Sequence, residues 1–233
     1  MKPKSLILLS GGLDSVVNFK KALEETEVVA ILTFNYEQKA LQKEIESTEL
    51  ISEMYNIKHK IISLDWLSEM DEGLTCGNIP KFDALRLDDL DYSKSTARAV
   101  WVPNRNGIMI NIAAAYADHS GINQIIVGFN REEGLTFPDN TSEFLQRTNA
   151  ALEYSTLVKP IVKSYTIDMD KTEIVRLGIE IKAPFEFIWS CYYSGREMCG
   201  ECESCQRLKR ALNTNNYFKE FESVNKWKFR KSC

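Results

Sequence analysis

The chain has 233 residues, of which 44% are apolar, and its formal net charge at pH 7 is −4. This length and apolar content suit one α/β domain with a small appendage. The mild negative charge gives no support to a nucleic-acid-binding surface, and no apolar run approaches membrane-spanning length. Residues 6–9 are too short a run for a signal peptide, so we expect a cytoplasmic protein whose six cysteines bind metal or stay free.

The most informative stretch follows the first predicted strand. Residues 5–9 are mostly apolar and predict a strand, and the run Ser10-Gly11-Gly12-Leu13-Asp14-Ser15 comes directly after it. A helical pattern begins at Val16. Glycines let backbone amides approach a ligand closely, and the N-terminus of the following helix favours an anion. The loop therefore predicts a phosphate-binding site rather than an ordinary strand-to-helix turn.

The loop does not fit the two common phosphate-binding motifs. A Walker loop needs a lysine after its last glycine, and a dinucleotide fingerprint needs a third glycine. The pattern Ser-Gly-Gly-x-Asp-Ser resembles instead the PP-loop of the N-type ATP pyrophosphatases. The resemblance implies that ATP is cut between its α and β phosphates and that an acceptor oxygen is adenylated.

Strand and helix patterns alternate along most of the chain. Alternation of this kind predicts a doubly wound, Rossmann-like parallel sheet with helices on both faces. A nearly all-round apolar pattern at 106–119 predicts a buried helix. The predicted strands are 5–9, 28–34, 59–64 and 124–128, and the other predicted helices are about 38–55, 140–157 and 170–178.

One long polar stretch, residues 71–98, breaks the alternation. It is rich in Asp, Ser and Gly, which predicts a loop. Loops of this length are lids over a site or disordered segments, and a lid is the interpretation we favour. We expect a PP-loop domain over residues 1–183 that carries this lid, followed by a metal-binding segment over 184–233.

Ligands of such sheets bind beyond the carboxyl ends of the strands. Thr33 and Asn35 end the second predicted strand, so we expect both to contact the nucleotide. The segments 98–106 and 128–139 lie at equivalent places in the predicted topology. They are therefore candidates for the rest of the site.

Four cysteines gather near the end of the chain, three of them in a C-x2-C-x2-C run. Four thiolates suit a tetrahedral zinc ion without an open position, so we predict a structural zinc site. An iron–sulfur cluster is the alternative, because similar spacing occurs in ferredoxins. Cys76 and Cys233 lie apart, and we expect both to be bystanders. The predicted ligands are Cys191, Cys199, Cys202 and Cys205.

Taken together, the motifs identify a family. The PP-loop, the run Val102-Pro103-Asn104-Arg105-Asn106, the stretch 128–139 and the cysteines occur in the order seen in QueC, the 7-cyano-7-deazaguanine (preQ0) synthase family. This resemblance covers nearly the whole chain. It implies conversion of 7-carboxy-7-deazaguanine and ammonia to the nitrile with ATP, a zinc-bearing C-terminal segment, and a homodimer. From the composition we expect no membrane or nucleic acid among its partners.

The resemblance also implies roles for nucleotide-binding residues. Asp14 coordinates Mg²⁺ or braces the loop, because a carboxylate alone repels phosphate. Arg105 stabilises charge on the phosphates in the transition state. The loop residues expected to hold the pyrophosphate are Ser10, Gly11, Gly12, Leu13 and Ser15.

For the acceptor, the carboxylates of the 128–139 stretch are candidates. Glu132, Glu133 and Asp139 are suited to accept hydrogen bonds from the N–H groups of a purine-like base. Phe137 is suited to stack on that base. The alternatives are a solvated acidic loop and a core phenylalanine.

Other functions remain open at this point. A QueC-like enzyme that adenylates a deazaguanine carboxylate for another nucleophile fits the same motifs. A tRNA thiolase needs a cysteine near the nucleotide, for which Cys76 is the candidate, and a basic face. A glutamine-dependent synthetase needs an N-terminal nucleophile domain, which we do not expect. A non-catalytic nucleotide- or zinc-binding module has no use for Asp14 and Arg105.

Overall fold

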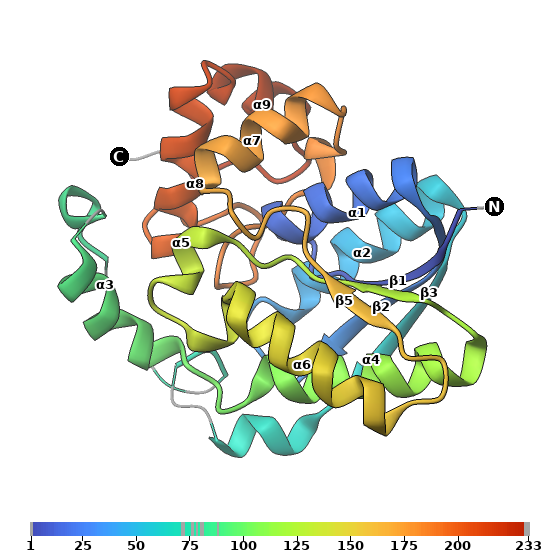
Figure 1. Cartoon of the computed structure of the whole chain (residues 1–233). Coiled ribbons are helices and arrows are strands. Elements are labelled where there is room, and N and C mark those ends of the chain that lie inside the picture. Colours follow the sequence, from blue (N-terminus) through green and yellow to red (C-terminus); the bar gives the residue numbers. More distant parts are fainter. Residues whose placement is uncertain are drawn as a thin grey trace.

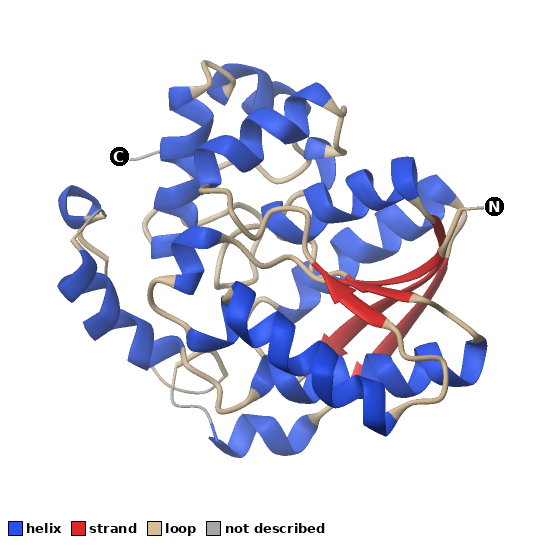
Figure 2. Cartoon of the chain, in the orientation of Figure 1, coloured by secondary structure: helices blue, strands red, loops and turns tan. Residues whose placement is uncertain are grey.

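The computed structural model describes residues 2–70, 73–75, 77, 79, 82–87 and 89–230. Its helices surround one parallel sheet, with the cysteine-bearing end of the chain at one side (Figures 1 and 2). Cys76 and Cys233 lie outside the described residues. The strands are β1 (Lys4–Leu8), β2 (Glu27–Asn35), β3 (Lys58–Ser63), β4 (Gln124–Ile126) and β5 (Ile161–Lys163). The helices are α1 (Leu13–Glu25), α2 (Leu41–Tyr55), α3 (Leu90–Ala97), α4 (Arg105–Ser120), α5 (Arg131–Gly134), α6 (Ser142–Ser155), α7 (Lys171–Glu180), α8 (Glu203–Thr214) and α9 (Phe218–Val224).

The five strands are all parallel and lie in the order β3-β2-β1-β4-β5. The first strand of the chain is therefore central, and the chain winds outward from it in both directions. This arrangement confirms the predicted doubly wound sheet, and its reversal point lies at the carboxyl end of β1, where such sheets bind ligands.

Two hydrophobic layers cover the two faces of the sheet. Successive residues of a strand point to opposite faces, so Ile7 packs in the layer of α1, α2 and α7 while Leu6 packs in the layer of α4 and α6. Leu208 of α8 and Phe221 of α9 join the same layer as Ile7. The core thus runs continuously across the predicted domain boundary at residue 183.

Three expectations differ from the structure. Strand β5 lies where no strand was predicted, because three residues are too few to show an alternating pattern. Within the expected loop 71–98, residues Leu90–Ala97 form a helix whose N-cap is the polar Asp89. Helix α4 is buried on one face only, and Ala115 on the other face is exposed.

Within the described residues, every helix is too short or too polar to cross a bilayer.

Candidate functional site

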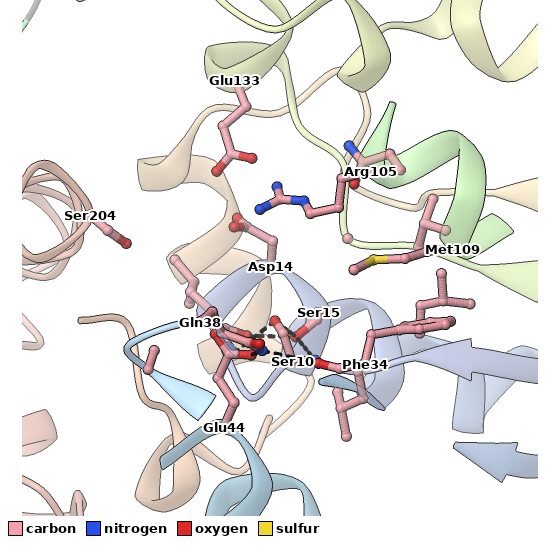
Figure 3. A pocket seen from close by; sticks show the side chains of 18 of the residues that line it. Ser10, Asp14, Ser15, Phe34, Gln38, Glu44, Arg105, Met109, Glu133 and Ser204 are labelled. Carbon is pink, nitrogen blue, oxygen red and sulfur yellow. Dashed lines mark hydrogen bonds between the residues drawn. The ribbon is translucent and has the colours of Figure 1, made fainter. Parts of the chain in front are cut away.

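Two adjoining cavities lie at the carboxyl ends of the central strands. The larger has a volume of about 270 Å³ and is lined by the loop after β1, by the end of β2 and by Arg105 of α4. The smaller, about 120 Å³, lies between Arg105, Phe137 and the start of α8. Figure 3 shows the side chains of Asp14, Glu133 and Arg105 reaching toward the same space.

The loop after β1 exposes the start of α1 to the larger cavity. The N-cap of α1 is Gly12, and no side chain caps its first amides, so these N–H groups stay available for an anion. Ser15 Oγ lies 3.2 Å from Ser10 Oγ and donates to the Gly12 carbonyl at 3.1 Å. These hydrogen bonds connect the two ends of the loop where it lines the cavity (Figure 3).

Two glycines allow this loop to pack where it does. Gly11 has φ +78°, and a Cβ there would lie 2.3 Å from Ser47 Oγ. At Gly128, which follows β4, a Cβ would lie 2.7 Å from the backbone nitrogen of Ser15. No side chain fits between these backbones, so the start of α1 is set directly against the chain that leaves β4.

A buried ammonium group lies above the PP-loop. Lys171, the first residue of α7, contacts the carboxylate of Asp14 and donates to Glu133 Oε1 at 2.7 Å. Its side chain is 8% exposed. The other oxygen of Asp14, Oδ1, is buried and has no hydrogen-bond partner among the described residues. One cation therefore serves two carboxylates, and one carboxylate oxygen is left to bind a further cation.

The pKa values of Asp14, Glu133 and Lys171 reflect the presence of two carboxylates around one ammonium group. Burial and the neighbouring charges of Glu133 and Glu132 raise the pKa of Asp14 to about 6, against the opposing effect of Lys171. Burial acts to raise the pKa of Glu133, but the charge and hydrogen bond of Lys171 lower it. Together with the Asn130 hydrogen bond and the charge of Arg105, they leave this pKa below its usual value. The pKa of Lys171 is raised, because Asp14 and Glu133 overcome the burial of its ammonium.

A second polar group lines the larger cavity on the β2 side. Gln38 Nε2 donates to Glu44 Oε2 at 2.7 Å and to the Phe34 carbonyl at 3.0 Å. Burial raises the pKa of Glu44 to about 7, although Gln38 and the charge of Arg105 oppose the rise. Arg105 itself donates to the Tyr36 hydroxyl at 3.0 Å.

The four cysteines converge as the sequence predicts. Their Sγ atoms all lie within 4.8 Å of one another, and none forms a disulfide. Cys199 and Cys205 sulfurs are 3.9 Å apart, close to the ~3.8 Å expected between ligands of a tetrahedral zinc–thiolate site. Backbone amides of Tyr193 and Cys199 both donate to Cys191 Sγ at 3.4 Å. These contacts favour thiolates, so the four residues fit a zinc ion.

The cysteine segment is tied to the PP-loop and to the smaller cavity. The backbone N–H of Trp189 donates to the Gly11 carbonyl at 2.9 Å. Glu132 accepts from the Lys171 backbone at 2.8 Å, from Arg207 at 2.6 Å and from Arg210 at 2.7 Å. Both arginines belong to α8, so one carboxylate joins the cysteine segment to the start of α7.

Comparison with known proteins decides the family. The model described as "Queuosine biosynthesis protein QueC" matches residues 4–216. This chain belongs to the QueC family.

Curated QueC relatives match along nearly their whole length. The 7-cyano-7-deazaguanine synthase of Bdellovibrio bacteriovorus is 46% identical over 217 residues, which cover 91% of this chain and 94% of that protein. The 7-cyano-7-deazaguanine synthase of Carboxydothermus hydrogenoformans is 48% identical over 213 residues, which cover 91% of this chain and 99% of that protein. Among solved structures, the NMN synthetase of Francisella tularensis is 16% identical with a TM-score of 0.45, covering 93% of this chain and 85% of that one.

The QueC resemblance drawn from the motifs is thereby confirmed, and the structure locates the residues predicted for its site. Ser10, Gly12, Leu13, Asp14 and Ser15 line the larger cavity, as does Arg105. Glu133 lines both cavities and Phe137 the smaller one, where its ring stacks on Trp101.

Four predicted residues lie outside the linings of both cavities. Thr33 is buried, and its hydroxyl donates a hydrogen bond to the Leu9 carbonyl and forms another with His59. The Asn35 side chain accepts a hydrogen bond from the Glu37 amide. Gly11 is a buried residue of the loop, and Asp139 is buried beside Asn140. The predicted ligand contacts of these residues gain no support from the cavities.

Lys171, Glu44 and Tyr192 are among the lining residues that were not predicted as site residues. Lys171 has a local signal, since it begins a helix with a capping box between Asp170 and Glu173. Its place beside the PP-loop depends on β5, which the sequence pattern did not reveal. In the sequence, Glu44 looks like an ordinary residue of a helix, and Tyr192 is marked only by its place beside Cys191. Neither position carries a motif that indicates a site.

Proposed function

We propose that this chain makes 7-cyano-7-deazaguanine from 7-carboxy-7-deazaguanine, ammonia and ATP, as an ATP-dependent ligase that forms C–N bonds. One observation carries the geometric side of the proposal: the PP-loop cavity shares a wall with a second cavity large enough for part of a planar base. A nucleotide and an acceptor can therefore meet at one place. The names of the curated relatives support this choice of acceptor.

In the nucleotide half, the uncapped start of α1 binds the pyrophosphate part of ATP. The proposed donors are the Leu13 amide and the Ser10 hydroxyl, joined by the Gly12 amide and the Ser15 hydroxyl. The last two would turn to the phosphate from Ser10 Oγ and the Gly12 carbonyl. Arg105 and Lys171 lie on the cavity wall and balance the negative charge that builds up as pyrophosphate leaves. Unlike a Walker loop, this site takes its lysine from a distant helix.

For Mg²⁺, Asp14 is the proposed ligand. Asp14 Oδ1 is buried without a partner, and carboxylate oxygens are the ligands that Mg²⁺ prefers. When bound, the ion would offset the charge of the phosphates. The four cysteines would hold Zn²⁺ in a structural role, with no open position.

In the acceptor half, the deazaguanine would lie in the smaller cavity. Phe137 offers a ring for stacking, and Glu133 accepts hydrogen bonds from the base. Glu132 is occupied by Arg207 and Arg210, so it serves to fix the wall rather than to bind the base.

The chemistry then needs two rounds at the same loop. In the first, a carboxylate oxygen attacks the α-phosphorus, pyrophosphate leaves, and ammonia displaces AMP to give an amide. In the second, the amide oxygen is adenylated and AMP leaves as the nitrile forms. Each round consumes one ATP and releases AMP and pyrophosphate.

Mass spectrometry of the product tests the proposal. The protein is incubated with 7-carboxy-7-deazaguanine, Mg·ATP and ammonium, and AMP is measured in parallel. We expect the nitrile and two AMP per nitrile. AMP formation with a substituted amide as product would indicate a different nucleophile, while ADP in place of AMP would contradict the PP-loop assignment.

The predicted homodimer is tested by light scattering, which should give twice the chain mass of 26.7 kDa.

A further inference from the structure

The wall shared by the two cavities is where the reacting atoms of a nucleotide and an acceptor would meet. Lining residues common to both cavities include six polar ones. They are Arg105, Glu133, Asn140, Lys171, Tyr192 and Ser204.

Five of these six polar groups already have partners. Lys171 bonds Asp14 and Glu133, and Arg105 bonds Tyr36. Asn140 donates to Asp139 at 3.2 Å, and Ser204 lies 2.9 Å from the Ser190 hydroxyl. The Tyr192 hydroxyl makes no hydrogen bond within the described part of the chain. A donor on a cavity wall without a protein partner is free to bind a ligand.

The ring of Tyr192 is held firmly. It packs against both hydrophobic layers of the protein, and the preceding residue is Cys191, one of the four converging cysteines. A ring fixed on both sides presents its hydroxyl in one place, which is what electrostatic catalysis requires of a donor.

We propose that Tyr192 is a catalytic residue of the acceptor half, whose hydroxyl donates a hydrogen bond to the acyl oxygen that becomes negatively charged when ammonia adds. This role rests on the proposed function. It gives the cysteine segment a direct part in the chemistry, beyond supporting the fold.

The nitrogen lone pair of ammonia forms a bond to the acyl carbon, and the carbonyl π electrons move to the oxygen that Tyr192 faces. When these electrons return, the bond from carbon to the adenylate oxygen breaks and AMP leaves with that electron pair. The added nitrogen loses a proton to water, and the amide remains. Tyr192 keeps its proton throughout.

The variant Tyr192→Phe removes only the hydroxyl, and two steps are measured separately. The first is the acid-dependent exchange of labelled pyrophosphate into ATP without ammonium, which reports adenylation. The second is amide formation in a single turnover at saturating ammonium. We expect the exchange rate to stay at the wild-type value and amide formation to slow about 100-fold.

Tyr193→Phe is the matched control, because Tyr193 lines neither cavity and is the next residue along. Both variants should keep the wild-type metal content. An equal slowing of both steps in Tyr192→Phe would indicate a structural role and overturn the inference, as would wild-type amide formation. A wild-type protein that forms no AMP with the acid would overturn the proposed function and this inference together.

Discussion

Lys171 neutralises only part of the charge around it. Asp14 and Glu133 both contact its ammonium, and Glu132 lies against its backbone amide. Without this cation, two carboxylates would face each other in a largely buried place. Removing one partner of a buried ion pair typically costs about 3–5 kcal/mol.

We therefore expect Lys171→Gln to lower the free energy of unfolding by about 3 kcal/mol at pH 8. Urea denaturation measures this change. The double variant Asp14→Asn with Lys171→Gln should recover most of the stability, since one of the opposed charges is gone, yet neither variant should form AMP at more than about 1% of the wild-type rate. Lys219→Gln, on the exposed side of α9, is the control and should match the wild type. Full AMP formation by Lys171→Gln would contradict the assigned role.

The raised pKa of Glu44 predicts how the free energy of unfolding depends on pH. Its pKa is about 7 in the folded protein and 4.5 in the absence of the fold, so the folded state retains a proton between these values that the unfolded state has lost. Stability should therefore fall as the pH rises from 4.5 to 7. The full shift corresponds to about 3 kcal/mol.

Glu44→Gln removes this ionisation and should raise the stability at pH 8 by up to about 3 kcal/mol, with little change at pH 4.5. Thermal melting at the two pH values checks the difference. Glu53→Gln, on an exposed part of the same helix, should have no such effect. A variant less stable than wild type at pH 8 would show that the Glu44 carboxylate is favourable in its charged form.

Between elements, the tightest constraint is the contact of Gly128 with the start of α1. A Cβ at Gly128 would lie 2.7 Å from Ser15 N and 2.9 Å from Ser15 Cα. Backbone atoms of a helix start cannot move aside as a flexible side chain can. The added methyl group would therefore push the loop away from the position in which it lines the larger cavity.

Gly128→Ala should cost about 1–3 kcal/mol of stability and raise the KM for ATP at least about tenfold. Gly195→Ala is a suitable comparison, because the nearest atom to its added Cβ would be at 3.5 Å. Steady-state kinetics with ATP varied give the KM. An unchanged KM would mean that the loop tolerates the displacement.

Elements with a strong local pattern were predictable, and those defined by long-range contacts were not. The strand, glycine loop and helix at residues 4–25 follow from periodicity and loop chemistry. By contrast, β5 has three residues and α3 has mostly polar ones. Lys171 is 157 residues from Asp14, and only the sheet order brings the two together. Thr33 lies at a strand end, where such sheets bind ligands, but its hydroxyl donates to the Leu9 carbonyl. Position at a strand end therefore does not decide which side chains face the cavity.

At the scale of the whole molecule, the cysteine segment supports the nucleotide site. Trp189, two residues before Cys191, bonds the Gly11 carbonyl of the PP-loop. Near the C-terminal end, Met198 pairs with Phe229 in a parallel bridge. Loss of the metal should thus affect the PP-loop as well as the segment that binds it.

Elemental analysis should find about one zinc per chain. Cys205→Ser should lose this metal, lower the free energy of unfolding by at least about 3 kcal/mol, and weaken ATP binding measured by calorimetry. Cys233→Ser, at a predicted free thiol, should keep all three properties. ATP binding of wild-type strength in a metal-free variant would show that the two sites are independent.

The contacts of Glu132 bear on how relatives of this protein change specificity. A single exchange at that position would leave two guanidinium groups of α8 without their shared anion and would free the amide that opens α7. Changes at Arg207 and Arg210 would have to compensate for the loss of this carboxylate. Divergence toward new acceptors on this scaffold is therefore expected to proceed by linked replacements in α5 and α8, and pairs of positions 75 and 78 residues apart should covary among homologues.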